Sequence, residues 1–188
     1  MLSQKYYDFL VESIENRKNI LIVGGTGSGK TTFINAIIKK ITEIHSEHRI
    51  IIIEDTGEIQ CEAKNRVILR ANKTTTMLTL LKATMRLRPD RILVGEVRGK
   101  EALDLLKAWN TGHPGGCATL HADSAYEGLL RMKELIAEGS TGDMQELIAR
   151  AVNIVVFMEK TPSGREIKEI IEVQDFNYET KKYVVKTI

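Results

Sequence analysis

Cysteine and proline are scarce in this sequence, and long apolar runs are missing. Two cysteines, Cys61 and Cys117, and three prolines occur among the 188 residues, and no CxxC pair is present. We therefore expect neither a disulfide framework nor a cysteine zinc site, and a reducing cytosol is the natural compartment. No apolar run approaches the roughly 20 residues that a membrane helix needs, and nothing at the N-terminus resembles a signal peptide. Any contact with a membrane is expected to be peripheral.

An excess of charge of one sign is also missing. The 27 basic and 25 acidic residues leave a formal net charge of +2. This balance, without any stripe of alternating aromatic and basic residues, indicates no direct sequence-specific nucleic-acid binding. The composition is 43% hydrophobic and 28% charged, which is typical of a globular protein. We expect one domain that covers residues 1–188.

Helical and strand-like patterns alternate over about 150 residues and then give way to strands alone. Helical spacing covers 2–16, 30–45, 75–87, 100–110, 124–137 and 143–151, and short apolar runs cover 19–23, 50–53, 67–69, 92–94 and 117–120. The last stretch has strand-like segments at 154–158, 167–176 and 183–187, with turns at 162–164 and 177–178. This order predicts an α/β fold with a mainly parallel sheet flanked by helices and a β-rich C-terminal tail.

A glycine-rich segment with the sequence GGTGSGKT lies between a predicted strand and a predicted helix, at residues 24–31. It fits the phosphate-loop pattern GxxxxGK[ST] at every fixed position. Glycines let backbone N–H groups turn toward phosphate oxygens, the lysine offers a cation, and the threonine hydroxyl is placed to ligate Mg²⁺. The residues expected to bind ATP are Gly24, Gly25, Thr26, Gly27, Ser28, Gly29, Lys30, Thr31 and Thr32.

Acidic residues follow two of the predicted strands. Glu54 and Asp55 come directly after 50–53, with Glu58 just beyond, and Glu96 follows 92–94 through a glycine. Ligands of open α/β sheets lie outside the carboxyl ends of the strands, so these side chains are expected to face the phosphate loop. The expected magnesium site consists of Thr31, Asp55 and Glu96, the last through water. Glu54 is expected to orient or deprotonate the attacking water, with support from Asp55 and Glu58. The roles of Glu54 and Glu96 are interchangeable at this stage, and loop solvation is the alternative explanation for such acids.

Histidines and arginines supply further candidates. His121 follows the predicted strand 117–120 and could sense the γ-phosphate, although a polar loop residue is the simpler interpretation. His45 and His48 fit that simpler interpretation at a charged helix end. Four arginines cluster near the strand 92–94, namely Arg86, Arg88, Arg91 and Arg98. A guanidinium can stabilise a transferring phosphoryl group, also from a neighbouring subunit, but at least two of the four are expected to be only solvated or ion-paired.

Four ordered blocks carry a resemblance to a known family. They are GGTGSGKTTF, IIIEDTGEIQ, RLRPDRILVGEVRG and NTGHPGGCATLHADS. Together they resemble the secretion (traffic) ATPases, and most closely the conjugal-transfer and type IV secretion branch. The resemblance implies a RecA-like P-loop fold, ATP hydrolysis with Mg²⁺, and a homo-hexameric ring. It also implies a peripheral place on the cytoplasmic side of the inner membrane, with other secretion-system components as partners.

The same resemblance implies roles for individual positions. The second block matches the family's Asp box through Glu54, Asp55 and Glu58, and the third matches its Walker B variant through Gly95 and Glu96. The fourth matches its His box through Gly112, His113 and His121. Arg86 and Arg98 match inter-subunit or nucleotide-sensing arginines. Only 23 residues precede Gly24, so the family's N-terminal domain is expected to be missing from this chain.

Alternatives to a conjugation or type IV secretion motor stay open. The absence of a CxxC pair argues against a type II assembly ATPase, while a pilus assembly or retraction motor is only weakly separated by sequence. A module from another class would bind ATP and use it to gate interactions, with little turnover. A RecA-like nucleic-acid motor is disfavoured by the charge balance.

Overall fold

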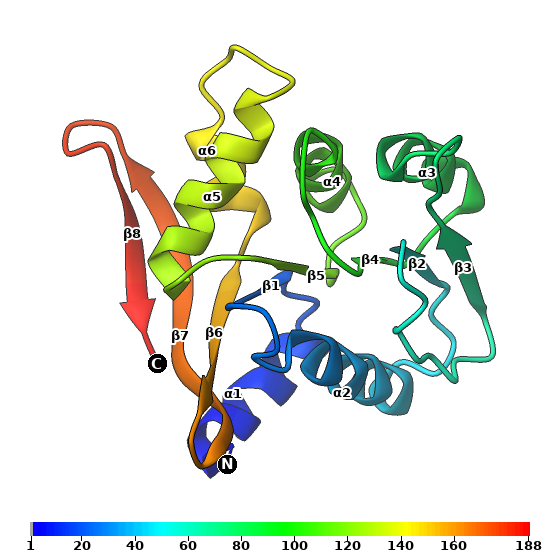
Figure 1. The fold of residues 1–188 in the computed structure, drawn as a ribbon, viewed down its shortest axis with the longest axis horizontal. Helices are drawn as coiled ribbons and strands as arrows, with labels where there is room; N and C mark the ends of the chain where they lie inside the picture. The colour runs from blue at the N-terminus through cyan, green and yellow to red at the C-terminus, as the bar shows by residue number, and fades with distance from the viewer. Residues whose placement is uncertain (1) are drawn as a thin grey trace.

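A single twisted sheet runs through the structure, a computed structural model that describes residues 2–188 (Figure 1). Within these residues the order of the eight strands is β3-β2-β4-β5-β1-β6-β7-β8. The strands are β1 (Ile20–Val23), β2 (Ile50–Glu54), β3 (Arg66–Arg70), β4 (Arg91–Val94), β5 (Cys117–Leu120), β6 (Ile154–Thr161), β7 (Gly164–Asn177) and β8 (Lys182–Thr187). Strands β1 to β6 pair in parallel, whereas β6–β7 and β7–β8 pair antiparallel. The mainly parallel sheet with a β-rich tail is thus confirmed.

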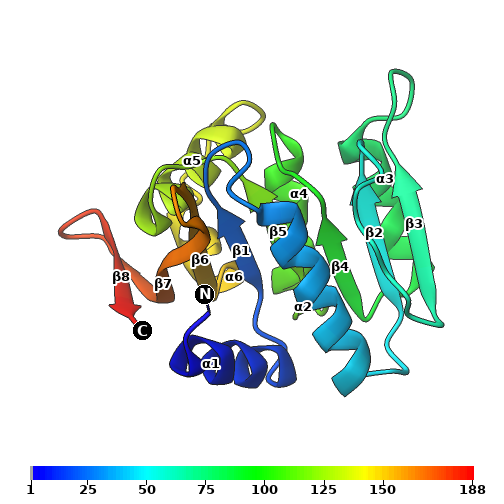
Figure 2. The ribbon, with the colours of Figure 1, turned by 60° about the horizontal axis from the view of Figure 1, so that its bottom comes forward.

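Helices cover both faces of the sheet. They are α1 (Gln4–Glu15), α2 (Lys30–Ile44), α3 (Met77–Thr84), α4 (Glu101–Asn110), α5 (Ala125–Ala137) and α6 (Gln145–Ala151). Figures 1 and 2 show α1 and α2 on one face and the other four helices on the opposite face. Among the described residues, no helix combines the length and the apolar composition that crossing a bilayer requires.

Because helices cover both faces of the sheet, the central strand β1 is apolar at every position. Along β1, Ile20 and Ile22 belong to the core that α1 and α2 cover, while Leu21 and Val23 belong to the core under α3 to α6. All four side chains are at most 1% exposed. Burying an apolar side chain of this size contributes about 1.5–3 kcal/mol, so both faces stabilise the position of this strand.

The helix predicted over 75–87 ends earlier than expected. Thr76 caps α3, its side chain accepting a hydrogen bond from the Thr79 N–H, and the α-helix stops at Thr84. A 3-10 turn follows at Met85–Leu87, and Arg88 then adopts a left-handed φ of 52° just before Pro89. A residue before a proline disfavours the right-handed helical region, which agrees with the left-handed φ of Arg88 after this turn.

Candidate functional site

The phosphate loop joins β1 to α2, at the carboxyl end of the central parallel strand. Gly29 has φ +98° and directly precedes the first residue of α2, a conformation that glycine adopts without strain. At Gly24 a Cβ atom would overlap the carbonyl oxygen of Met158 on β6. The loop therefore depends on glycine both for its turn and for its close approach to the neighbouring strand.

Lys30 reaches back over its own loop. Its Nζ donates hydrogen bonds to the carbonyl oxygens of Gly24 at 2.6 Å and Gly25 at 3.0 Å, and the residue is 8% exposed. Burial lowers the pKa of Lys30, and the nearby negative charge of Glu96 opposes that shift. The ammonium group is thus held at the N-terminus of α2, where backbone N–H groups and the helix dipole also favour an anion.

A cavity of about 410 Å³ opens beside this loop. Its walls come from the phosphate loop, from the segments after β2, β4 and β5, and from the start of β7. They comprise residues 26–32, Asp55, Thr56, Glu58, Ile59, Gly95, Glu96, Arg98, Thr119, His121 and Arg165. Three carboxylates, a histidine and two arginines therefore share one cavity with Lys30 and Thr31, as expected where parallel strands end together.

A chain of charged contacts crosses this cavity wall. Arg98 donates from Nη1 to Asp55 Oδ2 at 2.5 Å and from Nη2 to Glu96 Oε2 at 2.7 Å. The other Glu96 oxygen lies 3.1 Å from His121 Nε2. Burial works to raise the pKa of Glu96, but the hydrogen bond and charge of Arg98, together with His121 and Lys30, hold that pKa below its ordinary value. Glu96 is therefore an anion at neutral pH.

Glu54 lies behind the cavity rather than on its wall. The residue is 1% exposed, and Oε2 accepts a hydrogen bond from the Ile59 N–H at 3.0 Å. Within residues 2–188 its Oε1 has no hydrogen-bond partner, and Arg70 Nε lies 4.0 Å away. Glu58, which the sequence placed in support, does line the cavity. Glu54 itself is thus absent from the cavity lining, and its catalytic role stays a prediction.

The four arginines that cluster in sequence near β4 lie in different parts of the structure. Arg98 alone lines the cavity. Arg86 and Arg88 are exposed at the end of α3. Arg91 is 1% exposed and donates to Ile14 O, Gly115 O and His48 Nδ1, which makes it an anchor for the packing of the sheet. A role of Arg86 toward a neighbouring subunit stays a prediction.

His113 and Gly112 lie outside the cavity lining. His113 Nδ1 lies 2.8 Å from the Pro89 carbonyl oxygen, and thereby joins the turn after α4 to the turn before β4. Of the two histidines in the fourth block, only His121 thus faces the phosphate loop.

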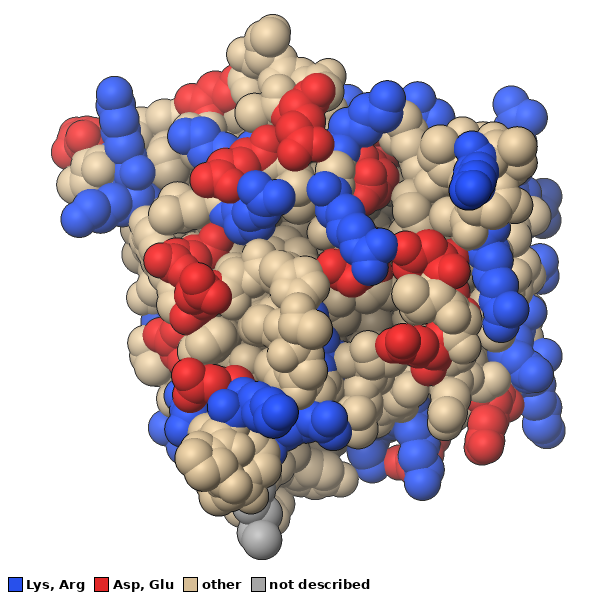
Figure 3. Space-filling model, viewed as in Figure 1, with Lys and Arg blue, Asp and Glu red and all other residues tan. Residues whose placement is uncertain are grey.

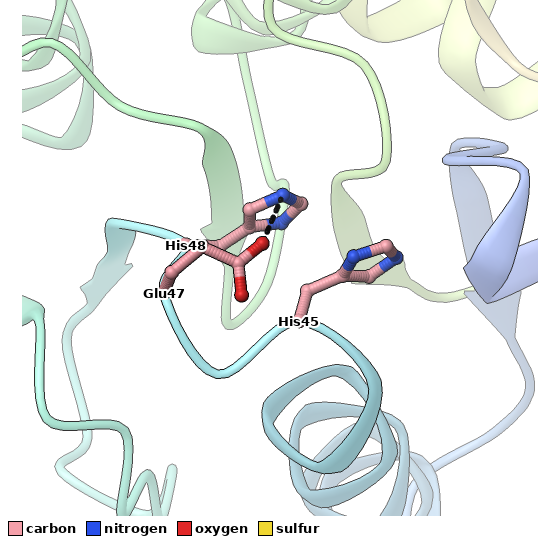
Figure 4. A group of neighbouring side chains, drawn as sticks. All are labelled: His45, Glu47 and His48. Atoms are coloured by element: carbon pink, nitrogen blue, oxygen red, sulfur yellow. Dashed lines mark ion pairs between the residues drawn. The ribbon is translucent and has the colours of Figure 1, made fainter.

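A second cluster of potential ligands, His45, Glu47 and His48, lies between α2 and β2 (Figure 4). The two imidazole rings stack with their centroids 4.3 Å apart and their planes within 3°. A metal ion binds in the plane of an imidazole, so two stacked parallel rings do not direct their nitrogens to one ion. His48 Nδ1 also accepts the hydrogen bond from Arg91 Nε at 3.1 Å. The cluster therefore serves packing, which goes beyond the interpretation of both histidines as polar loop residues.

Sequence reasoning missed Arg165. This residue is the second of β7, and its Nε donates to the Gly27 carbonyl oxygen at 3.1 Å. No local pattern marks it, because the contact depends on β6 pairing with β1 and on β7 folding back along β6. The contact between Arg165 and the phosphate loop could be predicted only with the strand order already known.

Charge on the molecular surface agrees with the low net charge. Figure 3 shows basic and acidic side chains interspersed over the face that it presents, without separation into large patches of one sign. This face therefore lacks the basic stripe that tracks a nucleic-acid backbone.

Comparison with known proteins places these features in a family. Residues 3–179 match the family described as type II/IV secretion system protein. The chain is 54% identical to a probable conjugal transfer protein TrbB of Sinorhizobium fredii over 164 residues, 87% of this chain and 50% of that protein. It is 51% identical to a conjugal transfer protein TrbB of Rhizobium radiobacter over 174 residues, 91% of this chain and 54% of that protein.

A solved structure shares the fold at similar coverage. The VirB11 ATPase of the Brucella suis type IV secretion system, crystallised with sulphate, superposes with a TM-score of 0.82 at 31% identity. The match covers 88% of this chain and 51% of that one, so the chain spans about half the length of the relatives it matches. Sequence, fold and site together show that this chain belongs to the type II/IV secretion system protein family.

Proposed function

We propose that this chain is the ATP-binding and ATP-hydrolysing domain of a motor subunit in a type IV secretion or conjugal DNA-transfer apparatus. The observation that carries the proposal is one cavity that holds the phosphate loop with Lys30 on one side and the ionised Glu96 on the other. Two relatives named for conjugal transfer and a structural neighbour from a type IV secretion system support the choice of apparatus.

The residues of the cavity fit a magnesium–nucleotide complex. The Thr31 hydroxyl and the Asp55 and Glu96 carboxylates supply oxygen ligands, which Mg²⁺ prefers, directly or through water. When bound, Mg²⁺ would neutralise charge on the phosphates. Gly27 lines the cavity and has a φ of +75°, a conformation that glycine adopts without strain. Backbone N–H groups of such a loop bind phosphate oxygens.

Each charged side chain then has a distinct part in hydrolysis. Lys30 exchanges the Gly24 and Gly25 carbonyl oxygens for phosphate oxygens. Arg98 holds the Glu96 carboxylate in place, and His121 contacts the other oxygen of that carboxylate. Glu54, the last residue of β2, is the predicted residue for orienting the attacking water, and Glu58 in the loop that follows lines the cavity.

The proposal for the wider assembly rests on the resemblance to secretion ATPases. We propose a homo-hexameric ring in the full-length protein, placed peripherally on the cytoplasmic side of the inner membrane, with other secretion-system components as partners. The exposed Arg86 is a residue that a neighbouring subunit can meet. A nucleotide-gated interaction module with little turnover is the alternative of another class.

Replacing Lys30 tests the proposal directly. We expect Lys30→Ala to abolish tight ATP binding and turnover, because it removes the phosphate-facing cation, while Lys39→Ala, which removes an exposed cation from the same helix, leaves both unchanged. Nucleotide binding by calorimetry and phosphate release measure the two steps. Wild-type behaviour of Lys30→Ala would refute the nucleotide site. Binding without turnover in the wild-type full-length protein would favour the gated module.

A further inference from the structure

The tip of the β6–β7 hairpin lies against the phosphate loop (Figure 2). Met158 on β6 meets the loop at Gly24 and Gly29, and the register of β6 against β7 shifts between Phe157 and Met158. A register shift of this kind bends a strand and re-aims its side chains. The antiparallel tail is thus in direct contact with the residues that bind phosphate.

Arg165 is the charged residue that this hairpin presents to the cavity. Its Nε donates to the Gly27 carbonyl oxygen at 3.1 Å, and its aliphatic part packs on Gly29, where a Cβ would lie 2.7 Å from Arg165 Cδ. The Nε contact leaves both terminal nitrogens of the guanidinium as further donors. Arg165 is therefore anchored to the loop while it still lines the cavity.

The positive charge of Arg165 is not neutralised by a neighbour. Glu166, the adjacent acid, accepts hydrogen bonds from Ser163 at 3.0 Å and Lys168 at 2.9 Å instead. Over residues 2–188, Arg165 takes part in none of the ion pairs, whereas Arg98 in the same cavity pairs with Asp55 and Glu96. A guanidinium with free donors beside a phosphate loop is suited to an anionic oxygen of the ligand.

Strand order indicates which end of the nucleotide Arg165 meets. The phosphate loop follows β1, and the acidic wall comes from β2 and β4, which lie on the β5 side of β1. Arg165 comes from β7, on the opposite, β6 side of β1. Because the γ-phosphate is attacked beside the acidic wall, the nucleoside end of a bound nucleotide extends toward β6 and β7.

We propose that Arg165 is a nucleotide-binding residue that contacts the α-phosphate, an inference that rests on the proposed function of the cavity. The contact joins the β-rich tail to the nucleotide, since the same guanidinium holds Gly27 through Nε. It also explains why the hairpin presents an arginine to the loop although no acidic partner is there.

A thermodynamic cycle with thio-substituted ADP tests this contact. Sulfur in place of a non-bridging oxygen on the α-phosphate weakens a hydrogen bond at that atom, and the same change on the β-phosphate is the matched control ligand. Binding of ADP, of the separate diastereomers of ADPαS, and of ADPβS is measured by calorimetry on the wild-type chain and on Arg165→Ala. Divalent cations are left out, so that the preference of metals for oxygen over sulfur does not enter. Lys160→Ala is the control protein, because Lys160 is a cation of the same hairpin outside the cavity lining.

We expect Arg165→Ala to weaken ADP binding about tenfold, as a lost charge-assisted hydrogen bond does, and Lys160→Ala to leave it unchanged. One α-thio diastereomer should bind the wild type more weakly than ADP does, and that difference should vanish in Arg165→Ala. The effect of β-thio substitution should be equal in the two proteins. An α-thio effect that survives in Arg165→Ala, or an unchanged affinity for ADP, would overturn the contact alone. Failure of the wild-type chain to bind any nucleotide would refute the proposed function and, with it, this inference.

Discussion

Arg98 and Glu96 are joined by a hydrogen bond of 2.7 Å, and this pair lies within the same cavity as the phosphate loop. The same guanidinium also reaches Asp55, so one arginine connects the segments that follow β2 and β4. Two acids placed side by side would repel each other and favour protonation. The shared arginine contacts both carboxylates, and its hydrogen bond and charge help to hold the pKa of Glu96 below its ordinary value.

Removing the charge of Glu96 should separate binding from hydrolysis. We expect Glu96→Gln to retain ATP binding, because Lys30 and the loop are untouched, and to slow hydrolysis about a hundredfold, which is typical for loss of a positioned catalytic group. Steady-state phosphate release in the full-length protein, with nucleotide affinity measured in parallel, checks both parts. Glu62→Gln, an exposed acid that does not line the cavity, is the control. Unchanged turnover would remove Glu96 from the mechanism.

Glu54 at the end of β2 and Glu58 in the loop that follows can be distinguished by a pair of variants. We expect Glu54→Gln to keep the fold and nucleotide affinity, since a glutamine oxygen can still accept from the Ile59 N–H, and to slow hydrolysis at least tenfold, because an amide cannot take a proton from the attacking water. Glu58→Gln is measured beside it, because Glu58 lines the cavity and Glu54 does not. Normal turnover in Glu54→Gln with slow turnover in Glu58→Gln would transfer the water-orienting role to Glu58.

Arg91 should matter for stability rather than for nucleotide chemistry. Arg91→Met leaves Ile14 O, Gly115 O and His48 Nδ1 without their donor, and unsatisfied buried acceptors of this kind cost about 1–3 kcal/mol each. We therefore expect a reduction of about 3 kcal/mol in the free energy of unfolding, measured by urea titration. Arg131→Met, which breaks only the exposed pair with Glu134, should change it by less than about 1 kcal/mol. Equal losses in the two variants would contradict the anchoring role.

His48 should make the fold sensitive to mild acid. Burial, followed by the charge of Arg91, lowers the pKa of His48 below its ordinary value of 6.5. A proton then binds the unfolded chain more readily than the folded one, so stability is complete above pH 6.5 and falls as the pH decreases through the lowered pKa. We expect Tm to drop between pH 7.5 and pH 5 in the wild type and to drop less in His48→Gln. Parallel curves for the two proteins would rule out this histidine as the source.

Local pattern was sufficient for the type of most elements and for the phosphate loop, but not for the end of the helix predicted over 75–87. The isoleucine run of β2 predicts a buried strand, and the glycines before Lys30 predict a phosphate-binding turn. Both predictions succeed because each pattern depends on residues close together in sequence. Pattern does not tell to which side the last side chain of a strand points. Glu54 thus turned into the protein, while Glu58, four residues on, lines the cavity.

Contacts between distant segments were the part that sequence could not supply. Arg91 looked like its exposed neighbours Arg86 and Arg88, yet it is buried because three oxygen or nitrogen acceptors from separate segments converge on it. Arg165 carried no motif at all, since its place depends on the pairing of β6 with β1. Both cases require knowledge of the strand order, which emerges only when the whole sheet is assembled.

The hydrogen bonds from Lys30 to the Gly24 and Gly25 carbonyl oxygens affect the rate and the affinity of phosphate binding. A long lysine side chain in solution samples many rotamers, and fixing it costs up to about 2 kcal/mol in conformational entropy. Here that ordering accompanies folding, so an arriving phosphate meets a preorganised cation and need only replace two carbonyl oxygens. A phosphate group can then bind without a slow rearrangement of the loop, which suits the nucleotide binding proposed above.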